Sequence, residues 1–230
     1  MPAKNRTKQY LKNGYYHIYN RGVNKRKIFK DEQDYKVFLS YLKEYLEPKS
    51  EEELRKALEK APYKDRGKIT RKLLLNNFSD KIKLLAYCLM PNHFHLLLKQ
   101  MTERAIEAFM KSLGTRYVMY FNKRHKRVGG LFQGAYKAVL VETDEQLFHV
   151  SRYIHCNPKE GLTQKSQTLL EYPYSSLGAY VGKWKAGWLK PKEVLDYFSK
   201  EDKESDYKSF VLGKEDGGDS LLFIKDLVLD

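Results

Sequence analysis

The sequence is poor in cysteine, in long apolar runs and, near its start, in acidic residues. Its two cysteines, Cys88 and Cys156, lie in apolar contexts, so neither a disulfide framework nor a cysteine-based zinc site is expected. No apolar run approaches the roughly 18 residues that a membrane helix needs. The N-terminus is rich in Lys and Arg and lacks the apolar segment of a signal peptide. These absences predict a cytoplasmic protein without a membrane partner.

Acidic residues are missing from Met1 to Lys30, a stretch that contains nine basic ones, Lys4, Arg6 and Lys8 among them, and the whole chain carries a net charge of +14. A second basic cluster runs from Lys123 to Arg127, and 18 tyrosines accompany this charge. Localised positive charge binds phosphates and aromatic rings stack on bases, so a nucleic acid is the favoured partner. The alternative is that the lysines solvate helices and the tyrosines fill strands. The candidate backbone contacts are Arg21, Lys25, Arg26, Lys27, Lys123, Arg124, Lys126 and Arg127.

Hydrophobic periodicity predicts an α+β fold. Strands are expected at residues 14–23, 84–90, 93–99 and 131–141, and helices at 31–47, at 102 to about 121 and at 143–156, with N-caps at Thr102 and Thr143. The order is strand, helix, strand, strand, helix, strand, helix. It matches the ferredoxin-like split βαβ pattern, an antiparallel sheet with two helices on one face. The other face is expected to be open and able to hold a site.

Two regions fall outside this pattern. Residues 49–80 are highly charged, and they are interpreted as an insertion with two short helices outside the core. After Pro158 the pattern weakens, and residues 201–230 are rich in acid. We therefore expect one domain over residues 1–180, with an insertion at about 49–80, and an acidic C-terminal extension over 181–230.

The most informative stretch is Leu84 to Gln100, LLAYCLMPNHFHLLLKQ. Pro91 and Asn92 supply a turn between two strands. Because strand side chains alternate, His93 and His95 are expected to share one face while Phe94 points into the core on the other. Paired imidazoles suggest a metal site, although two half-buried histidines that only bond to their neighbours are about equally consistent with this spacing.

A third partner for the histidines is expected on the last core helix, where His149, Tyr153 and Asn157 are spaced by four residues and share a stripe. A phenol can attack a phosphodiester, and an amide oxygen can complete a metal shell begun by two imidazoles. With 18 tyrosines in the chain, packing remains an alternative role for Tyr153.

The sequence resembles the single-tyrosine HUH transposases, and among them the REP-associated tyrosine transposases. The resemblance runs from about Tyr15 to Tyr180. Its motifs are YHIYNRG (16–22), MPNHFHLLL (90–98), YFNKRHKRVGGLFQGAYKAVLV (120–141), RYIHCNP (152–158) and YPYSS (172–176). The loop after Asn157 is one residue shorter than is common in the family, and the insertion at 49–80 has no strong counterpart in the family pattern.

This resemblance implies a ferredoxin-like catalytic domain and a DNA strand transferase. His93, His95 and Asn157 would be the metal ligands, and Tyr153 the nucleophile that forms a 5′-phosphotyrosine with single-stranded or hairpin DNA. The family favours Mg²⁺ or Mn²⁺, although two imidazoles also suit zinc. The alternative function is a non-catalytic nucleic-acid-binding protein, and both a monomer and a homodimer remain open. His17 is expected to border the metal site without being a ligand, so His17→Ala should leave metal affinity nearly unchanged.

Overall fold

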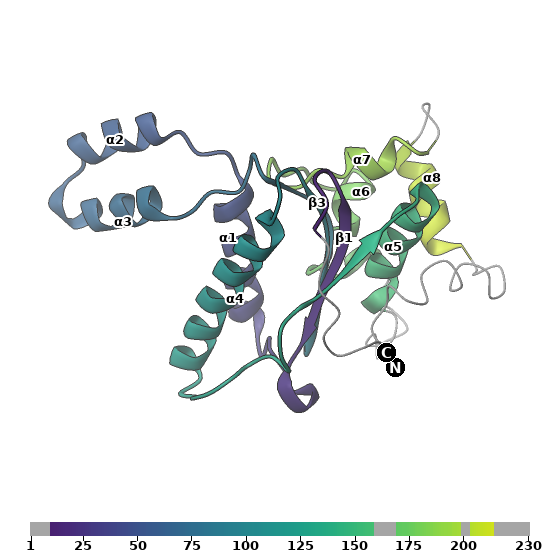
Figure 1. Ribbon diagram of the computed structural model, residues 1–230, viewed down its shortest axis with the longest axis horizontal. Helices are drawn as coiled ribbons and strands as arrows, with labels where there is room; N and C mark the ends of the chain where they lie inside the picture. Colours follow the sequence, from purple (N-terminus) through teal and green to yellow (C-terminus); the bar gives the residue numbers. More distant parts are fainter. Residues whose placement is uncertain (1–9, 159–168, 199–202, 214–230) are drawn as a thin grey trace.

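The computed structural model describes residues 10–158, 169–198 and 203–213. The basic residues Lys4, Arg6 and Lys8 and the acidic tail beyond residue 213 lie outside the described residues. Four strands form one antiparallel sheet in the order β2-β3-β1-β4, with β1 at Tyr15–Arg21, β2 at Ile82–Met90, β3 at His93–Gln100 and β4 at Lys137–Val141 (Figure 1). The predicted α+β class, the order of elements and the ferredoxin-like sheet are confirmed.

The β2–β3 hairpin turns at Pro91-Asn92, as its sequence predicts, and Met90 pairs with His93. Both backbone carbonyls of the turn accept hydrogen bonds from the segment after β1. The Asn92 oxygen accepts from the Gly22 N–H at 2.8 Å, and the Pro91 oxygen accepts from the Ile28 and Phe29 N–H groups at 2.7 and 3.0 Å. The loop after β1 therefore holds the turn that begins β3.

One face of the sheet packs against two long helices, α1 (Glu32–Leu46) and α4 (Ala105–Arg124). Ile18, Phe94 and Leu96 from the strands meet Phe38 and Phe109 from the helices, and all five are almost completely buried. Apolar residues at helical spacing on both helices produce this layer. This layer is the main core of the molecule. Because strand side chains alternate, the histidines of β3 lie on the opposite face of the sheet.

Two local predictions on this side were wrong. Thr102 does not cap α4; Arg104, with φ 56°, is its N-cap residue, and the Ile106 N–H donates to Gln100 Oε1 at 3.0 Å. The end of β3 thus supplies the cap. The strand predicted from residue 131 begins only at Lys137, because Gln133 N–H bonds to the Arg21 oxygen and Phe132 makes only an isolated bridge with Gly22.

The second face of the sheet, expected to be open, is covered. Helix α5 (Asp144–Cys156) lies across it, followed by the 3-10 turn η3 (Leu169–Glu171), α6 (Leu177–Tyr180), α7 (Lys192–Leu195) and α8 (Lys203–Leu212) (Figure 1). Leu97 and Val141 pack there with Val150, Ile154 and Val194. The sequence pattern missed this layer because its short C-terminal helices carry weak periodicity.

The described C-terminal residues also cover the edge of β2. Leu89 N–H donates to the Tyr174 oxygen at 2.9 Å, Ser176 N–H donates to the Tyr87 oxygen at 3.0 Å, and Lys190 N–H donates to the Leu84 oxygen at 2.8 Å. The YPYSS motif at 172–176 therefore pairs with the outer strand of the sheet. Covering an edge strand in this way removes a template for unwanted pairing.

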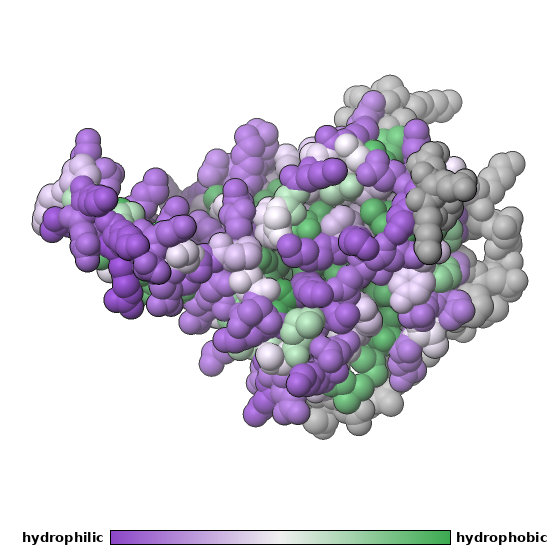
Figure 2. Space-filling model, turned by 90° about the horizontal axis from the view of Figure 1, so that it is seen from above, coloured by the Kyte–Doolittle hydropathy of each residue, from purple (hydrophilic) through white to green (hydrophobic). Residues whose placement is uncertain are grey.

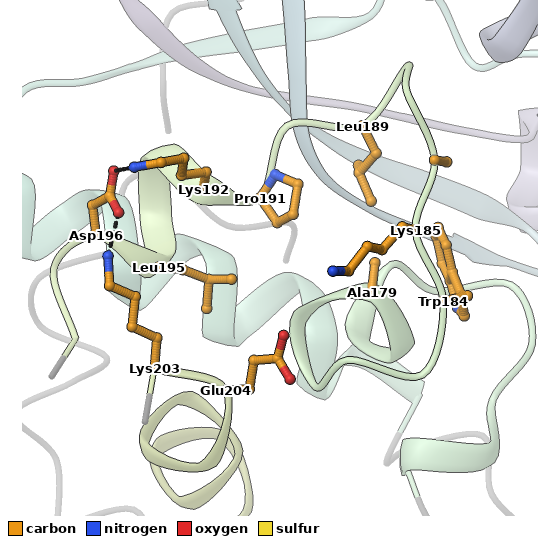
Figure 3. Close-up of a pocket in the computed structure, with 11 residues that line it drawn as sticks. Ala179, Trp184, Lys185, Leu189, Pro191, Lys192, Leu195, Asp196, Lys203 and Glu204 are labelled. Carbon is orange, nitrogen blue, oxygen red and sulfur yellow. Dashed lines mark hydrogen bonds and ion pairs between the residues drawn. The ribbon is translucent and has the colours of Figure 1, made fainter. Parts of the chain in front are cut away.

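Charged groups fix α7 against the sheet. Glu193 accepts from Lys99 Nζ at 2.8 Å, from Lys83 Nζ at 2.5 Å and from the Tyr15 hydroxyl at 3.0 Å. The same C-terminal elements enclose a pocket of about 400 Å³ whose walls include Trp184 and Leu189, with Asp196 bridging two lysines at its rim (Figure 3). None of the predicted site residues lines this pocket.

The predicted insertion forms a helical arm, α2 (Glu51–Lys60) and α3 (Tyr63–Leu74), that projects from the α1 side of the molecule (Figure 1). Neither helix has a buried residue. Hydrophilic residues dominate the face of the arm that is visible in Figure 2. No helix in the described parts of the chain is both long and apolar enough to cross a membrane. Both cysteines are free thiols.

Candidate functional site

Strand β3 places His93 and His95 side by side on the face covered by α5. Their ring centroids lie 4.9 Å apart at an interplanar angle of 87°. His17 on the neighbouring strand β1 has the same facing, and its ring stacks on His95 with centroids 5.1 Å apart. Alternation along the two strands thus produces a cluster of three imidazoles.

His95 is completely buried, and its two ring nitrogens are in contrasting situations. Nδ1 lies 2.9 Å from His17 Nε2, within hydrogen-bonding distance. Nε2 has no hydrogen-bond partner among the described residues. Burial lowers the pKa of His95 well below its ordinary value, and His17 and His93 lower it further. The ring is therefore neutral, and a buried nitrogen without a partner is chemically suited to binding a metal ion.

Both ring nitrogens of His93 lie within hydrogen-bonding distance of an amide oxygen. Nδ1 lies 2.6 Å from Asn92 Oδ1, and Nε2 lies 2.9 Å from Asn157 Oδ1, the residue that ends α5. A neutral imidazole has one N–H and can donate to only one of these two amide oxygens. With the proton on Nδ1, donated to Asn92, the Nε2 lone pair faces the Asn157 oxygen. A cation held by both atoms would satisfy both.

The donor set fits a divalent ion. In an octahedral shell with bonds of about 2.1 Å, adjacent ligand atoms are roughly 3.0 Å apart, close to the 2.9 Å between His93 Nε2 and Asn157 Oδ1. Among the described residues there is no group of three or more His, Cys, Asp or Glu side chains arranged as a metal site. A metal site here would therefore need the neutral amide of Asn157 beside the two imidazoles, which is the ligand set expected from the sequence.

Tyr153 lies on α5 one turn before Asn157, and its ring packs edge-on against the histidines. The ring centroid is 5.5 Å from that of His95 and 5.9 Å from that of His17. Thr143 fixes the start of this helix, because its side chain accepts from the Gln146 N–H at 3.1 Å. His149, placed on the same stripe by its spacing, instead contacts the rings of Phe148 and Phe210.

A buried polar network on the other side of α5 was not predicted. His155 Nδ1 lies 2.7 Å from the Tyr207 hydroxyl, and His155 Nε2 lies 2.7 Å from Ser176 Oγ. Ser151 Oγ lies 2.9 Å from the same Tyr207 hydroxyl. Burial lowers the pKa of His155 to about 3. The helix that carries Tyr153 is thus joined to α8 and, through Ser176, to β2.

The two predicted basic segments lie next to each other in space. Val23 N–H donates to the Leu131 oxygen at 3.0 Å, which joins the loop after β1 to the loop after α4. Lys25, Arg26, Lys27, Lys123 and Lys126 are exposed.

Some of the predicted DNA contacts are already bonded within the protein. Arg124 pairs with Asp31 and with the completely buried Asp34, both at 2.7 Å, and lowers the pKa of Asp31. Arg127 donates to Asn122 Oδ1 at 3.1 Å, and Arg21 donates to Gln133 Oε1 at 3.3 Å. These arginines hold the loops that display the exposed lysines.

Residues 55–157 match the family model of the IS200-like transposases. The resemblance to the tyrosine transposases is confirmed. The matched segment begins within α2, spans just under half of the chain and contains His93, His95, Tyr153 and Asn157. This match supports a transposase-type, DNA-cleaving function.

No curated protein matches the chain. Among solved structures, it is similar to a REP-associated tyrosine transposase bound to a REP hairpin, with 14% sequence identity and a TM-score of 0.46 over 80% of this chain and 92% of that one. At this level of similarity, no residue role is transferred.

Proposed function

We propose that the protein cleaves and rejoins single-stranded DNA through a covalent 5′-phosphotyrosine on Tyr153, assisted by a divalent ion, Mg²⁺ or Mn²⁺, held by His93, His95 and Asn157. The observation that carries this proposal is the buried His95 Nε2 without a partner, beside the His93 and Asn157 pair at 2.9 Å. The Tyr153 ring packs directly against this cluster. When bound, the ion would polarise the scissile phosphate and stabilise the charge that develops on it.

The remaining chemistry belongs to Tyr153. Its hydroxyl oxygen attacks the phosphorus, the bond from phosphorus to the 3′ oxygen breaks, and the phenol proton is lost while the departing 3′ oxygen gains one. The same 3′-hydroxyl, or one from another strand, can then attack the phosphotyrosine and release Tyr153. The number of phosphoester bonds is conserved, so neither water nor a nucleoside triphosphate is consumed.

Two neighbouring residues would orient the imidazoles. Asn92 Oδ1 can hold the proton on His93 Nδ1, and His17 Nε2 can hold the proton on His95 Nδ1. Both rings then present Nε2 as the ligand atom. Such bonds to the second ring nitrogen of a metal-binding histidine fix its tautomer and its orientation.

We further propose that DNA approaches along the two basic loops. The loop at 22–29 also donates hydrogen bonds to the turn before His93. The proposed phosphate-binding surface is therefore directly connected to the strand that carries the histidines. Exposed Lys25, Arg26, Lys27, Lys123 and Lys126 would contact the backbone, supported by Arg21, Arg124 and Arg127. The catalytic domain would comprise residues 1–180. A hairpin with a single-stranded tail is the substrate to test first, in view of the family resemblance.

The decisive experiment asks whether DNA becomes covalently attached to Tyr153. Labelled hairpin DNA is incubated with the protein and Mg²⁺ or Mn²⁺, and the products are separated on a denaturing gel. Wild-type protein should carry label. Tyr153→Phe removes only the hydroxyl, so it should bind metal and DNA almost normally and carry none.

Matched variants locate the nucleophile. Tyr117 is completely buried, and its hydroxyl donates to the Ile28 oxygen at 2.6 Å, so Tyr117→Phe should still form the adduct. His93→Ala and His95→Ala should lose both metal affinity and cleavage. An adduct that persists in Tyr153→Phe would place the nucleophile elsewhere. Specific DNA binding by the wild type without any adduct would favour the alternative, a non-catalytic nucleic-acid-binding protein.

A further inference from the structure

The helical arm has almost no core of its own. The apolar side chains between α2 and α3 are only half-buried, namely Leu54, Leu58, Ile69 and Leu73. Two helices with so small a seam gain little from burial. The arm nevertheless has a fixed base, because the Lys49 ammonium donates to the Leu73 oxygen at 3.0 Å and to the Lys72 oxygen at 3.3 Å, which caps α3.

The connection to the body is equally specific. Asn77 Nδ2 donates to the Glu47 oxygen at 2.8 Å, and Phe78 N–H donates to the Tyr45 oxygen at 2.8 Å. Both acceptors belong to the end of α1 or the residue after it. The arm therefore has a defined orientation at its base while both of its helices remain exposed to solvent.

The two helices of the arm differ in how many of their cations form ion pairs. On α2, Arg55 lies 3.7 Å from Glu51 and Lys56 lies 2.6 Å from Glu52, so these cations are paired within the helix. Of the five cations on α3, Arg66 donates to the Ala61 oxygen at 3.1 Å. The other four, Lys64, Lys68, Arg71 and Lys72, are exposed, and the structure gives their side chains no ion pair in the described parts of the chain. On α2 only Lys60, at the C-terminal end, is exposed without a pair in the described parts of the chain, so most of the unpaired cations of the arm lie on α3.

These four α3 cations form a stripe, and Arg66 lies outside it. At 100° per residue, positions 64, 68, 71 and 72 fall within an arc of about 100°, and Ile69 and Leu73 lie to one side of that arc, toward α2. The one acid on α3, Asp65, lies at the border of the stripe. From Lys64 to Lys72 the stripe is about 12 Å long, roughly the axial length of three to four base pairs.

We propose that the cationic stripe of α3, made of Lys64, Lys68, Arg71 and Lys72, is a second DNA-binding surface that contacts the phosphate backbone of duplex outside the catalytic site. This proposal rests on the proposed function in taking DNA as the partner. A rigid base, an exposed helix and unpaired positive charge suit backbone contact, which needs no shaped pocket. The contact should be independent of sequence.

The test uses two double variants that change net charge equally. Lys68→Gln with Lys72→Gln removes two cations of the stripe, whereas Arg55→Gln with Lys56→Gln removes two cations that are paired on α2. Binding of a fluorescent DNA hairpin with a single-stranded tail is measured by anisotropy between about 50 and 200 mM salt. Two lost contacts should reduce the slope of log K against log salt by about 1.8. The affinity of wild type should then fall over this range by about tenfold more than that of the stripe variant.

The control variant should keep a slope close to that of wild type. Equal slopes for the two double variants, or no change in either, would overturn the proposal, because the effect would then be one of net charge or absent. A change in molecular mass by light scattering with unchanged DNA binding would also overturn it and assign the stripe to contact between two copies of the chain.

Failure of this proposal can be distinguished from failure of the proposed function. If wild type binds the hairpin and forms the adduct while the stripe variant behaves like the control, only the arm is misassigned. If wild type does not bind the hairpin at all, both proposals fail. Circular dichroism of each variant checks that α2 and α3 remain helical.

Discussion

The contact between His17 and His95 gives a prediction that separates a supporting residue from a ligand. His17 is completely buried, its ring stacks on His95, and its Nε2 lies 2.9 Å from His95 Nδ1. His17→Phe keeps a ring in the same space and removes the nitrogen. His17→Gln keeps a polar atom that can accept from the Nδ1–H group. Comparing the two isolates the hydrogen bond from the packing.

The expected magnitude follows from the burial of this bond. In His17→Phe the Nδ1–H group of His95 loses its buried acceptor, which costs about 1–3 kcal/mol, and the ring is no longer confined to the tautomer with a free Nε2. Since about 1.4 kcal/mol is a factor of ten, metal affinity should fall by about 10- to 100-fold. His17→Gln should stay within about threefold of wild type, because about 0.6 kcal/mol corresponds to that ratio.

Isothermal titration of Mn²⁺ into each metal-free protein measures these affinities, with His95→Ala as the reference for loss of a ligand. An affinity of His17→Phe equal to that of wild type would refute the tautomer argument. A loss as large as that in His95→Ala would make His17 a ligand. The sequence alone predicted nearly unchanged affinity for His17→Ala, because the family pattern and the two adjacent histidines already account for the site. Strand adjacency does not reveal a distance between nitrogens. The 2.9 Å contact now raises the expected loss.

Three other measurements test the packing and charge described above. Tyr207→Phe should lower the free energy of unfolding by about 1–3 kcal/mol in urea, because buried His155 Nδ1 loses its partner. Tyr197→Phe loses only an exposed hydrogen bond, so it should cost less than about 1 kcal/mol. Equal losses in the two variants would contradict this. Because the pKa of His155 falls to about 3 on folding, the unfolded chain binds the extra proton below about pH 6.5. Stability should therefore drop by about 1.4 kcal/mol per pH unit from there towards pH 3, and His155→Gln should flatten this decline in urea midpoints. Lys25→Gln with Lys27→Gln should weaken binding to all DNA sequences alike and reduce the salt slope by about 1.8, and loss for one hairpin sequence only would show base reading instead.

The sequence predicted best what depends on short-range pattern. Alternation along β3 correctly placed His93 and His95 on one face, and Asn157, expected near them, lies within hydrogen-bonding distance of His93. The turn at Pro91-Asn92 and the Thr143 cap were also local and correct. The facing of the histidines, the turn and the cap depend on neighbouring residues alone, so one sequence was enough to find them.

What the sequence missed depends on contacts between distant segments. Asp34 is completely buried and binds Arg124, which pattern alone had assigned to DNA. Tyr207 lies outside the family resemblance, yet it bonds to the helix that carries Tyr153. The face expected to be open is covered because several short helices, individually weak in pattern, pack together on it. No periodicity within one segment records which distant partner buries it.

The pairing along the edge of β2 determines where the chain can be shortened. Strand β2 is almost wholly apolar, and its outer backbone groups bond to Tyr174, Ser176 and Lys190. A chain cut at residue 180 would keep the first two partners and lose Lys190, Glu193 and the α8 anchor. The newly exposed part of β2 would then be an unprotected apolar edge strand in a less stable sheet, and it would be prone to pair with other molecules. A chain cut at residue 180 should therefore aggregate on expression, whereas the longer chain should stay soluble. Extending the short chain to residue 213 should restore its solubility.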